Sequence, residues 1–220
     1  MATEEERDTA GRPTAYPVRF SVDYPSVPLD RLSTALRLFA AIPILIVLAA
    51  LSGGGSGGSG AEEGVRIDLD GTGLLSLAPL LLIVFRRKYP RWWFDWNLAF
   101  ARFGARVGAY LMLLTDRYPS TEEEQGVHLD ILYPNIEQDL NRWLPLVKWF
   151  LAIPHYVVLI LLGMAAFFVV LIAWFAILLT GQYPRPLFDF VVGTMRWTYR
   201  VVGYAFILTT DRYPPFRLTD

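Results

Sequence analysis

The feature that most constrains this chain is a long segment without a charged side chain. Residues 149–184 contain no Asp, Glu, Lys or Arg. A single helix of this length, at 1.5 Å per residue, would measure about 54 Å, whereas the hydrocarbon core of a bilayer is about 30 Å thick. The segment therefore predicts a membrane protein in which the chain folds back at Gly163. We expect two helical arms there, over residues 144–162 and 164–180.

The overall composition favours the same class of protein and excludes several others. Hydrophobic residues make up 54% of the chain and charged residues 19%, and the seven Trp residues suit a membrane interface. The net charge of -1 provides no excess of cations for binding nucleic acid. Cysteine is absent and histidine occurs twice, which excludes thiolate chemistry and disfavours a metal site. We therefore expect neither a metal nor a cofactor.

The N-terminal half carries a weaker version of the apolar pattern. Its uncharged arms cover residues 38–51 and 74–85, and the first extends back to Leu29 if Arg31 and Arg37 snorkel to the headgroups. The second arm fits either a tilted span or a re-entrant segment.

A Gly/Ser-rich insertion, residues 52–73, separates these two arms and is expected outside the cell. Its run at 53–60 has the composition of a flexible linker, natural or engineered. Residues 1–15 are acidic and expected to be disordered, and no signal peptide is apparent in the N-terminal sequence. These features predict a cytoplasmic N-terminus.

The two halves of the sequence match each other, which indicates a tandem duplication. Unit 1 covers residues 16–119, an acidic linker covers 120–126, and unit 2 covers 127–218. The matched segments are VRFSVDYP (18–25) with VHLDILYP (127–134), RLFAAIP (37–43) with KWFLAIP (148–154), YPRWWFD (89–95) with YPRPLFD (183–189), and TDRYP at 115–119 and 210–214.

Each unit is predicted to contain a short β-strand, a transmembrane helical hairpin and an amphipathic helix. The Phe-Asp helix start, the paired arginines, the closing Thr-Asp-Arg-Tyr-Pro and the strand before the hairpin resemble a bacterial membrane-protein family, the domain of unknown function 4389. The resemblance covers about residues 16–218 and implies an architecture without implying an activity. No catalytic residue is carried over from it.

The amphipathic helices, residues 92–114 and 187–209, either lie in the membrane interface or cross the bilayer. Interfacial helices give four spans with both termini in the cytoplasm, whereas crossing helices give six spans. The first arrangement leaves Arg66 as the only cation in the external loops, as the positive-inside rule favours. We therefore expect a mainly α, multi-pass protein of the bacterial plasma (inner) membrane. Its two strands are expected to form a small cytoplasmic β-element with edges open to a partner.

Two groups of interfacial residues are candidate contacts with lipid or protein. Arginines repeat on one stripe of each amphipathic helix, where they suit phosphate headgroups, or else pair with Asp116 and Asp211 and dock the helix. The first group is Arg102, Arg106, Arg196 and Arg200. The expected interfacial anchors are Trp92, Trp93, Trp96 and Trp197.

Three further residues are candidates inside the apolar segments. Pro43 and Pro154 occupy matching repeat positions and are expected to kink their helices. His155 is the titratable side chain of the charge-free segment, and Ile44 stands at the matching position of unit 1. An intramembrane site and a hydrogen-bonded packing residue are both consistent with His155.

The sequence predicts a non-catalytic membrane protein that acts as an accessory, assembly or scaffold subunit of a membrane complex. Its expected partners are the lipid bilayer and a second membrane protein or a further copy of itself. A small transporter or lipid-handling protein, with a site between the repeats near His155, is the alternative. A receptor for soluble partners acting through the acidic residues 122–137 is a third reading. An enzyme is not expected, because no catalytic constellation is recognisable.

Overall fold

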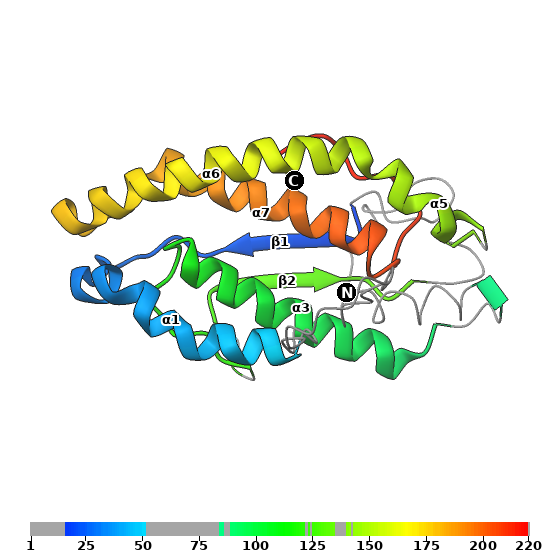
Figure 1. Cartoon of the computed structure of the whole chain (residues 1–220), viewed down its shortest axis with the longest axis horizontal. Helices are drawn as coiled ribbons and strands as arrows, with labels where there is room; N and C mark the ends of the chain where they lie inside the picture. Colours follow the sequence, from blue (N-terminus) through cyan, green and yellow to red (C-terminus); the bar gives the residue numbers. More distant parts are fainter. Residues whose placement is uncertain are drawn as a thin grey trace, which may run out of the picture.

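The computed structural model describes residues 16–51, 84–85, 89–121, 123, 125–134, 140–141 and 143–219. These parts of the chain form a mainly helical structure with one pair of strands (Figure 1). The acidic residues 1–15, the insertion 52–73 and most of the predicted arm 74–85 lie outside the described residues.

The two strands predicted from the alternating sequence pair with each other, which confirms a small strand pair. β1 (Val18–Val22) and β2 (Val127–Ile131) are antiparallel, with Phe20 opposite Leu129. Burial alternates along both strands, because successive side chains point to opposite faces. One face of this ribbon is apolar and buried, and the other, the outer face, exposes polar side chains.

The buried face of the ribbon is covered by two amphipathic helices, α3 (Arg91–Leu111) and α7 (Arg185–Ala205). Each begins directly after a Tyr-Pro pair, whose proline is the N-cap residue of the helix. α7 packs against β1 and α3 packs against β2 (Figure 1). Each helix therefore covers the strand from the other half of the sequence.

Helix α7 approaches β1 closely because a glycine stands at the crossing. A Cβ atom on Gly203 would lie 2.6 Å from Cγ2 of Val18, which is closer than van der Waals contact permits. The side chains of Val18, Phe20 and Leu129 enter the main core together with those of α7.

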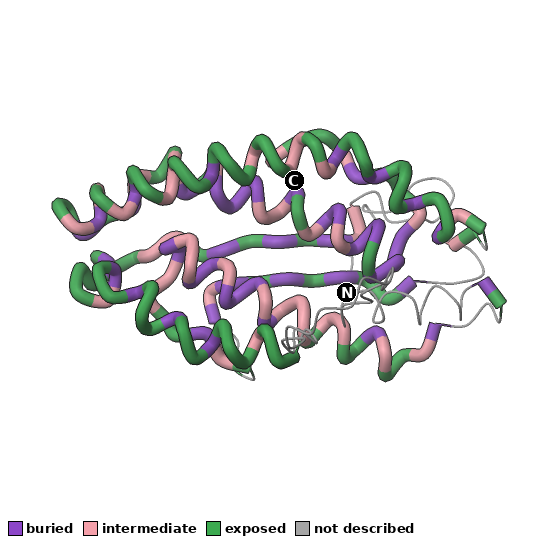
Figure 2. The backbone as a smooth tube through the Cα atoms, in the orientation of Figure 1, coloured by how far each residue is buried: buried purple, intermediate pink, exposed green. Residues whose placement is uncertain are grey.

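The apolar helices are α1 (Arg31–Leu51) and α6 (Ile153–Thr180), and both are long and apolar enough to cross a membrane. They pack on α3 and α7, and their opposite faces are exposed along the helices (Figure 2). At 1.5 Å per residue, the 28 residues of α6 extend about 42 Å.

The hairpin predicted at Gly163 is wrong, because α6 continues through this residue without a break. A glycine inside a helix costs only about 1 kcal/mol relative to alanine, and the apolar residues on both sides are strong enough helix formers to continue. The interruption lies instead at Ala152, between α5 (Leu144–Leu151) and α6. Pro154 follows this break and has no amide hydrogen to donate to Phe150.

Candidate functional site

The arginine stripes of α3 and α7 point at the ribbon. Arg102 donates from Nε to the main-chain oxygen of Leu129 at 2.8 Å, and Arg196 donates from Nε to that of Phe20 at 2.9 Å. Phe20 and Leu129 face each other in the ladder, so the two arginines bind the ribbon from its opposite edges. The central main-chain oxygen of each edge is therefore already bound by a helix arginine, and the contact of these edges with a partner stays a prediction.

The second arginine of each stripe holds the segment that follows its own helix. Arg106 donates to the main-chain oxygen of Ser120 at 2.8 Å. Arg200 donates to the main-chain oxygens of Arg217 and Thr219, at 3.1 and 2.8 Å. Both side chains are buried. These arginines thus hold α3 and α7 in place, but they bind main-chain oxygens and not the predicted Asp116 and Asp211.

Those two aspartates bind cations on other helices. Asp116 pairs with Arg37 of α1, and Asp211 lies 2.7 Å from Nζ of Lys148 in α5. Lys148 is completely buried. The aspartate of each Thr-Asp-Arg-Tyr-Pro segment thus pairs with a buried cation, in the N-terminal part of α1 and in the last turn of α5.

An aromatic ring completes each of these ion pairs. The Arg37 guanidinium carbon lies 4.6 Å from the ring centre of Tyr110, and Lys148 Nζ lies 5.1 Å from that of Tyr204. Cations over an aromatic face are stabilised by its quadrupole. The two halves of the chain therefore contain the same three-part contact at matching sequence positions.

His155 lies in an aromatic cluster at the start of α6 and is completely buried. Trp197 donates from Nε1 to its Nδ1 at 3.0 Å, and Phe216 stacks on the imidazole with ring centres 4.1 Å apart. Among the described residues, Nε2 has no hydrogen-bond partner. The prediction of Trp197 as an interfacial anchor is wrong, since its apolar ring and its N–H are both used inside the protein.

The other predicted residues lie apart from this cluster. Trp92 and Trp96 of α3 are exposed, and Trp93 is half-buried between them, with its ring 5.8 Å from that of Trp96. Pro43 lies inside α1, and Pro154 lies at the start of α6. The structure thus brings His155 to Trp197 but not to the tryptophans of α3.

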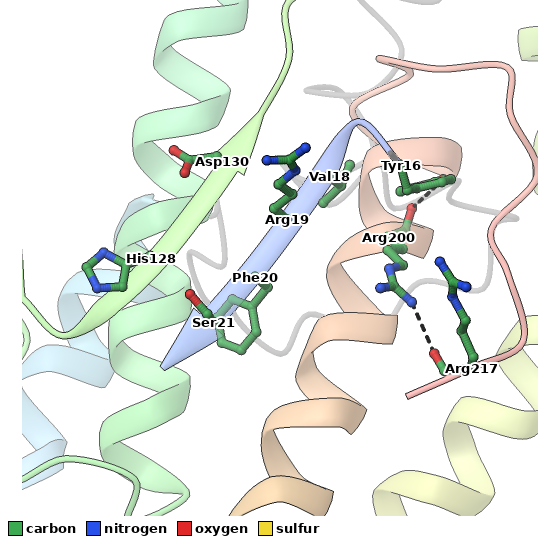
Figure 3. A pocket seen from close by; sticks show the side chains of 9 residues that line it. All are labelled: Tyr16, Val18, Arg19, Phe20, Ser21, His128, Asp130, Arg200 and Arg217. Carbon is green, nitrogen blue, oxygen red and sulfur yellow. Dashed lines mark hydrogen bonds between the residues drawn. The ribbon is translucent and has the colours of Figure 1, made fainter. Parts of the chain in front are cut away.

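A pocket of about 390 Å³ lies between the outer face of β1 and the C-terminal segment (Figure 3). Three arginines line it, and Asp130 is its one carboxylate among the described residues. Asp130 is itself paired with Arg102 at 2.9 Å. The lining residues are Tyr16, Val18, Arg19, Phe20, Ser21, His128, Asp130, Arg200 and Arg217.

Tyr16 closes one end of this pocket. Its hydroxyl donates to the main-chain oxygen of Arg212 at 3.2 Å and approaches that of Arg200 at 3.5 Å. Burial raises the pKa of Tyr16 above its ordinary value, despite the opposing charges of Arg200 and Arg212. The hydroxyl therefore stays protonated and remains a hydrogen-bond donor.

A second pocket, of about 370 Å³, lies on the β2 side of the ribbon. It is lined by two arginines, Arg102 and Arg106, and by two aspartates, Asp95 and Asp130. Among the described residues, its lining contains as many aspartates as arginines. The sequence reasoning missed Arg19 and Arg217, although the alternation of β1 already places Arg19 on the outer face.

Comparison with known proteins gives one family match. A family model described as a domain of unknown function (DUF4389) matches residues 143–217, from the start of α5 to the C-terminal segment. Curated proteins and solved structures give no match. The family match supports the resemblance over the second half of the chain and carries no activity.

Proposed function

We propose that this chain is a non-catalytic integral membrane protein that serves as an accessory, assembly or scaffold subunit of a membrane complex. The observation that carries the proposal is the exposed apolar surface of α1 and α6. Exposed apolar surface of this extent marks a membrane or protein interface. Lipid and a membrane-protein partner, or a second copy of the chain, would share that surface.

The charged residues support a structural role. Arg37 and Lys148 hold α1 and α5 to the two Thr-Asp-Arg-Tyr-Pro segments, and Arg102 and Arg196 hold the amphipathic helices to the ribbon. These contacts position elements relative to one another. A protein built in this way presents a defined surface to a partner.

The corresponding contacts also support a tandem duplication. The Asp116 and Asp211 pairs match in sequence position, and so do the Arg102 and Arg196 bonds to facing strands. Two copies of a unit that cannot bury its own strand would exchange strands in this way. A bacterial plasma membrane with cytoplasmic termini remains our proposal for the location.

The sequence predicted four spans arranged as two helical hairpins. We propose a different topology, because α6 is one continuous helix. α1 and α6 are the two candidate spans of the described chain. The 42 Å length of α6 exceeds the hydrocarbon thickness and would be accommodated by tilt or by a protruding end.

Site-specific photo-crosslinking in cells tests the scaffold role. A photoreactive residue replacing Phe168 lies on the exposed face of α6, and one replacing Trp92 lies on α3. A partner subunit should crosslink discretely from Phe168 and not from Trp92. Adducts to lipid alone at Phe168 and at Phe39 of α1 would count against the proposal.

A lipid-handling protein is the second candidate, and the arginine-lined pocket beside β1 favours it. Arg19, Arg200 and Arg217 provide guanidinium groups that suit phosphate oxygens. The transporter form of this candidate places the site at His155 and predicts that the loss of its imidazole abolishes flux.

A further inference from the structure

We propose that the outer face of the ribbon is a path along which the headgroup of a zwitterionic phospholipid crosses the bilayer, while its acyl chains stay in the hydrocarbon. This inference gives the lipid-handling candidate a specific action. It rests on α1 and α6 crossing the membrane and is independent of the scaffold role. The outer face is formed by five exposed polar side chains. They are Arg19 and Ser21 of β1, Asp23 directly after it, and His128 and Asp130 of β2.

With α1 and α6 across the bilayer, the ribbon lies at the depth of the hydrocarbon. α7 packs between β1 and α6, and α3 packs between β2 and α1. Figure 1 shows the two strands running along the direction of α1 and α6, within the length of α6. The five residues of a strand extend about 17 Å, roughly half of the hydrocarbon thickness. Polar side chains at this depth have to meet water, protein or polar groups of lipid.

Two hollows along the ribbon provide room for a headgroup. One of about 390 Å³ lies beside β1, and the other, of about 370 Å³, lies beside β2. His128 and Asp130 line both hollows, which therefore adjoin on the outer face. Each volume lies at the lower end of the range of about 300–1,000 Å³ seen for small-molecule sites. Such hollows suit a phosphocholine or phosphoethanolamine group, and the acyl chains would remain outside.

The charges of the outer face occur as exposed contacts between opposite signs. Asp130 pairs with Arg102 at 2.9 Å, and Arg19 points toward the same carboxylate (Figure 3). His128 lies 3.3 Å from Asp23. The two aspartates are 70% and 71% exposed, and exposed ion pairs of this kind open at little cost. The surface thus offers cations to a phosphate and carboxylates to an ammonium, and its weak contacts allow a headgroup to move on.

The apolar helices suit the acyl chains of the same lipid. α1 and α6 expose apolar side chains along their length (Figure 2). A headgroup that crosses a bare bilayer has to bury its charges in hydrocarbon, which is costly without polar partners. Along the ribbon, polar side chains replace that environment while the acyl chains stay beside apolar ones. The arrangement therefore lowers the barrier to crossing.

Exchange of lipid between the two leaflets tests this path on the full chain. The protein is reconstituted into phosphatidylcholine vesicles that contain a trace of phosphatidylcholine with a fluorescent NBD group on one acyl chain. Dithionite added outside the vesicles bleaches the label of the outer leaflet. Vesicles with the wild-type protein should also lose the label of the inner leaflet, whereas protein-free vesicles should retain it.

The test variant is the double substitution Ser21→Leu with His128→Leu. These residues face each other in the ladder, and their side chains are exposed, so the change makes the middle of the path apolar without removing a buried contact. Ser26→Leu is the matched control, because Ser26 is also exposed and lies outside both hollows. Circular dichroism of all three proteins checks that they are folded.

The double variant should exchange lipid at least about tenfold more slowly, since each hydrogen bond lost to the passing headgroup contributes a factor of about five. The Ser26→Leu protein should exchange lipid like the wild type. Equal rates for the double variant and the control, or a wild-type rate no faster than that of protein-free vesicles, would overturn the path.

A second measurement examines whether another copy of the chain covers the outer face. The chain contains no cysteine, so Ser21→Cys introduces a single thiol. In the same vesicles under oxidising conditions, this variant should remain monomeric. A quantitative disulfide between two copies would mean that the face is an interface and would also overturn the path. None of these results affects the capture of a protein partner by α6, so the scaffold proposal fails or survives separately.

Discussion

Arg196 donates a hydrogen bond from Nε to the main-chain oxygen of Phe20, 176 residues earlier in the sequence and 2.9 Å away. This bond joins the helix of the second half of the chain to the strand of the first. Its counterpart joins Arg102 to Leu129 at 2.8 Å. The fold therefore depends on contacts that cross between the two halves.

The substitution Arg196→Gln should destabilise the protein by at least about 1.5–3 kcal/mol, because it removes two hydrogen bonds from a charged donor, to the main-chain oxygens of Phe20 and Leu218. Arg102→Gln should have a smaller effect, since the Arg102 side chain is 41% exposed. Thermal unfolding followed by circular dichroism measures both, with Arg117→Gln as the exposed control. Equal melting temperatures for Arg196→Gln and the control would contradict the crosswise contact.

Lys148 and Asp211 form a buried ion pair whose disruption should be costly. Lys148→Met leaves Asp211 without its cation and should cost about 3–5 kcal/mol. Lys148→Arg should remain close to the wild type, because Arg37 makes the corresponding pair with Asp116. A double-mutant cycle with Asp211→Asn measures the coupling, and strictly additive effects would exclude the ion pair.

Two glycines of the amphipathic helices should respond to alanine in opposite directions. Gly203→Ala forces a Cβ against Val18 and should separate α7 from β1. Gly104→Ala meets no atom within 4 Å and should stabilise α3 by up to about 1 kcal/mol through its helix propensity. Melting temperatures of the two variants test this contrast. A stable Gly203→Ala protein would mean that α7 and β1 lie further apart.

Removal of the His155 imidazole should leave Trp197 without an acceptor for its indole N–H. His155→Ala should cost at least about 1–3 kcal/mol for that unsatisfied donor. His155→Asn should recover part of the loss, because its side-chain oxygen can accept the same hydrogen bond. Equal melting temperatures for His155→Ala and His155→Asn would mean that the hydrogen bond from Trp197 does not stabilise the protein.

The same variants separate the two candidate functions. A transporter with its site at His155 should lose flux in His155→Asn, whereas a scaffold that stays folded should keep its partner. Partner capture and flux, measured on one preparation, distinguish the two.

Local patterns in the sequence were sufficient to predict the strands and the amphipathic helices, but not their partners. Alternation over residues 18–22 and 127–131 predicted both strands, and the repeated arginine spacing predicted α3 and α7. The exchange of strands between halves was not predictable, because identical local patterns allow either pairing. For the same reason, neither predicted role of the arginines, binding phosphate headgroups or pairing with Asp116 and Asp211, identified the main-chain oxygens that accept their hydrogen bonds.

The error at Gly163 has a different physical origin. The length of the charge-free segment predicts a turn, because 36 helical residues exceed one perpendicular span, and Gly163 lies near its middle. Nothing within 4 Å would oppose a Cβ there, and a glycine with helical neighbours does not end a helix. The glycine that does end α6 is Gly181, whose φ of 75° lies in the left-handed region.

The most direct test of the membrane scaffold is extraction of the full chain in native lipid nanodiscs without detergent, followed by mass spectrometry of every component. We predict a stoichiometric membrane-protein partner, or a defined oligomer of the chain, in the same particle. A monodisperse single copy without a protein partner, whatever the expression level, would contradict the proposed function.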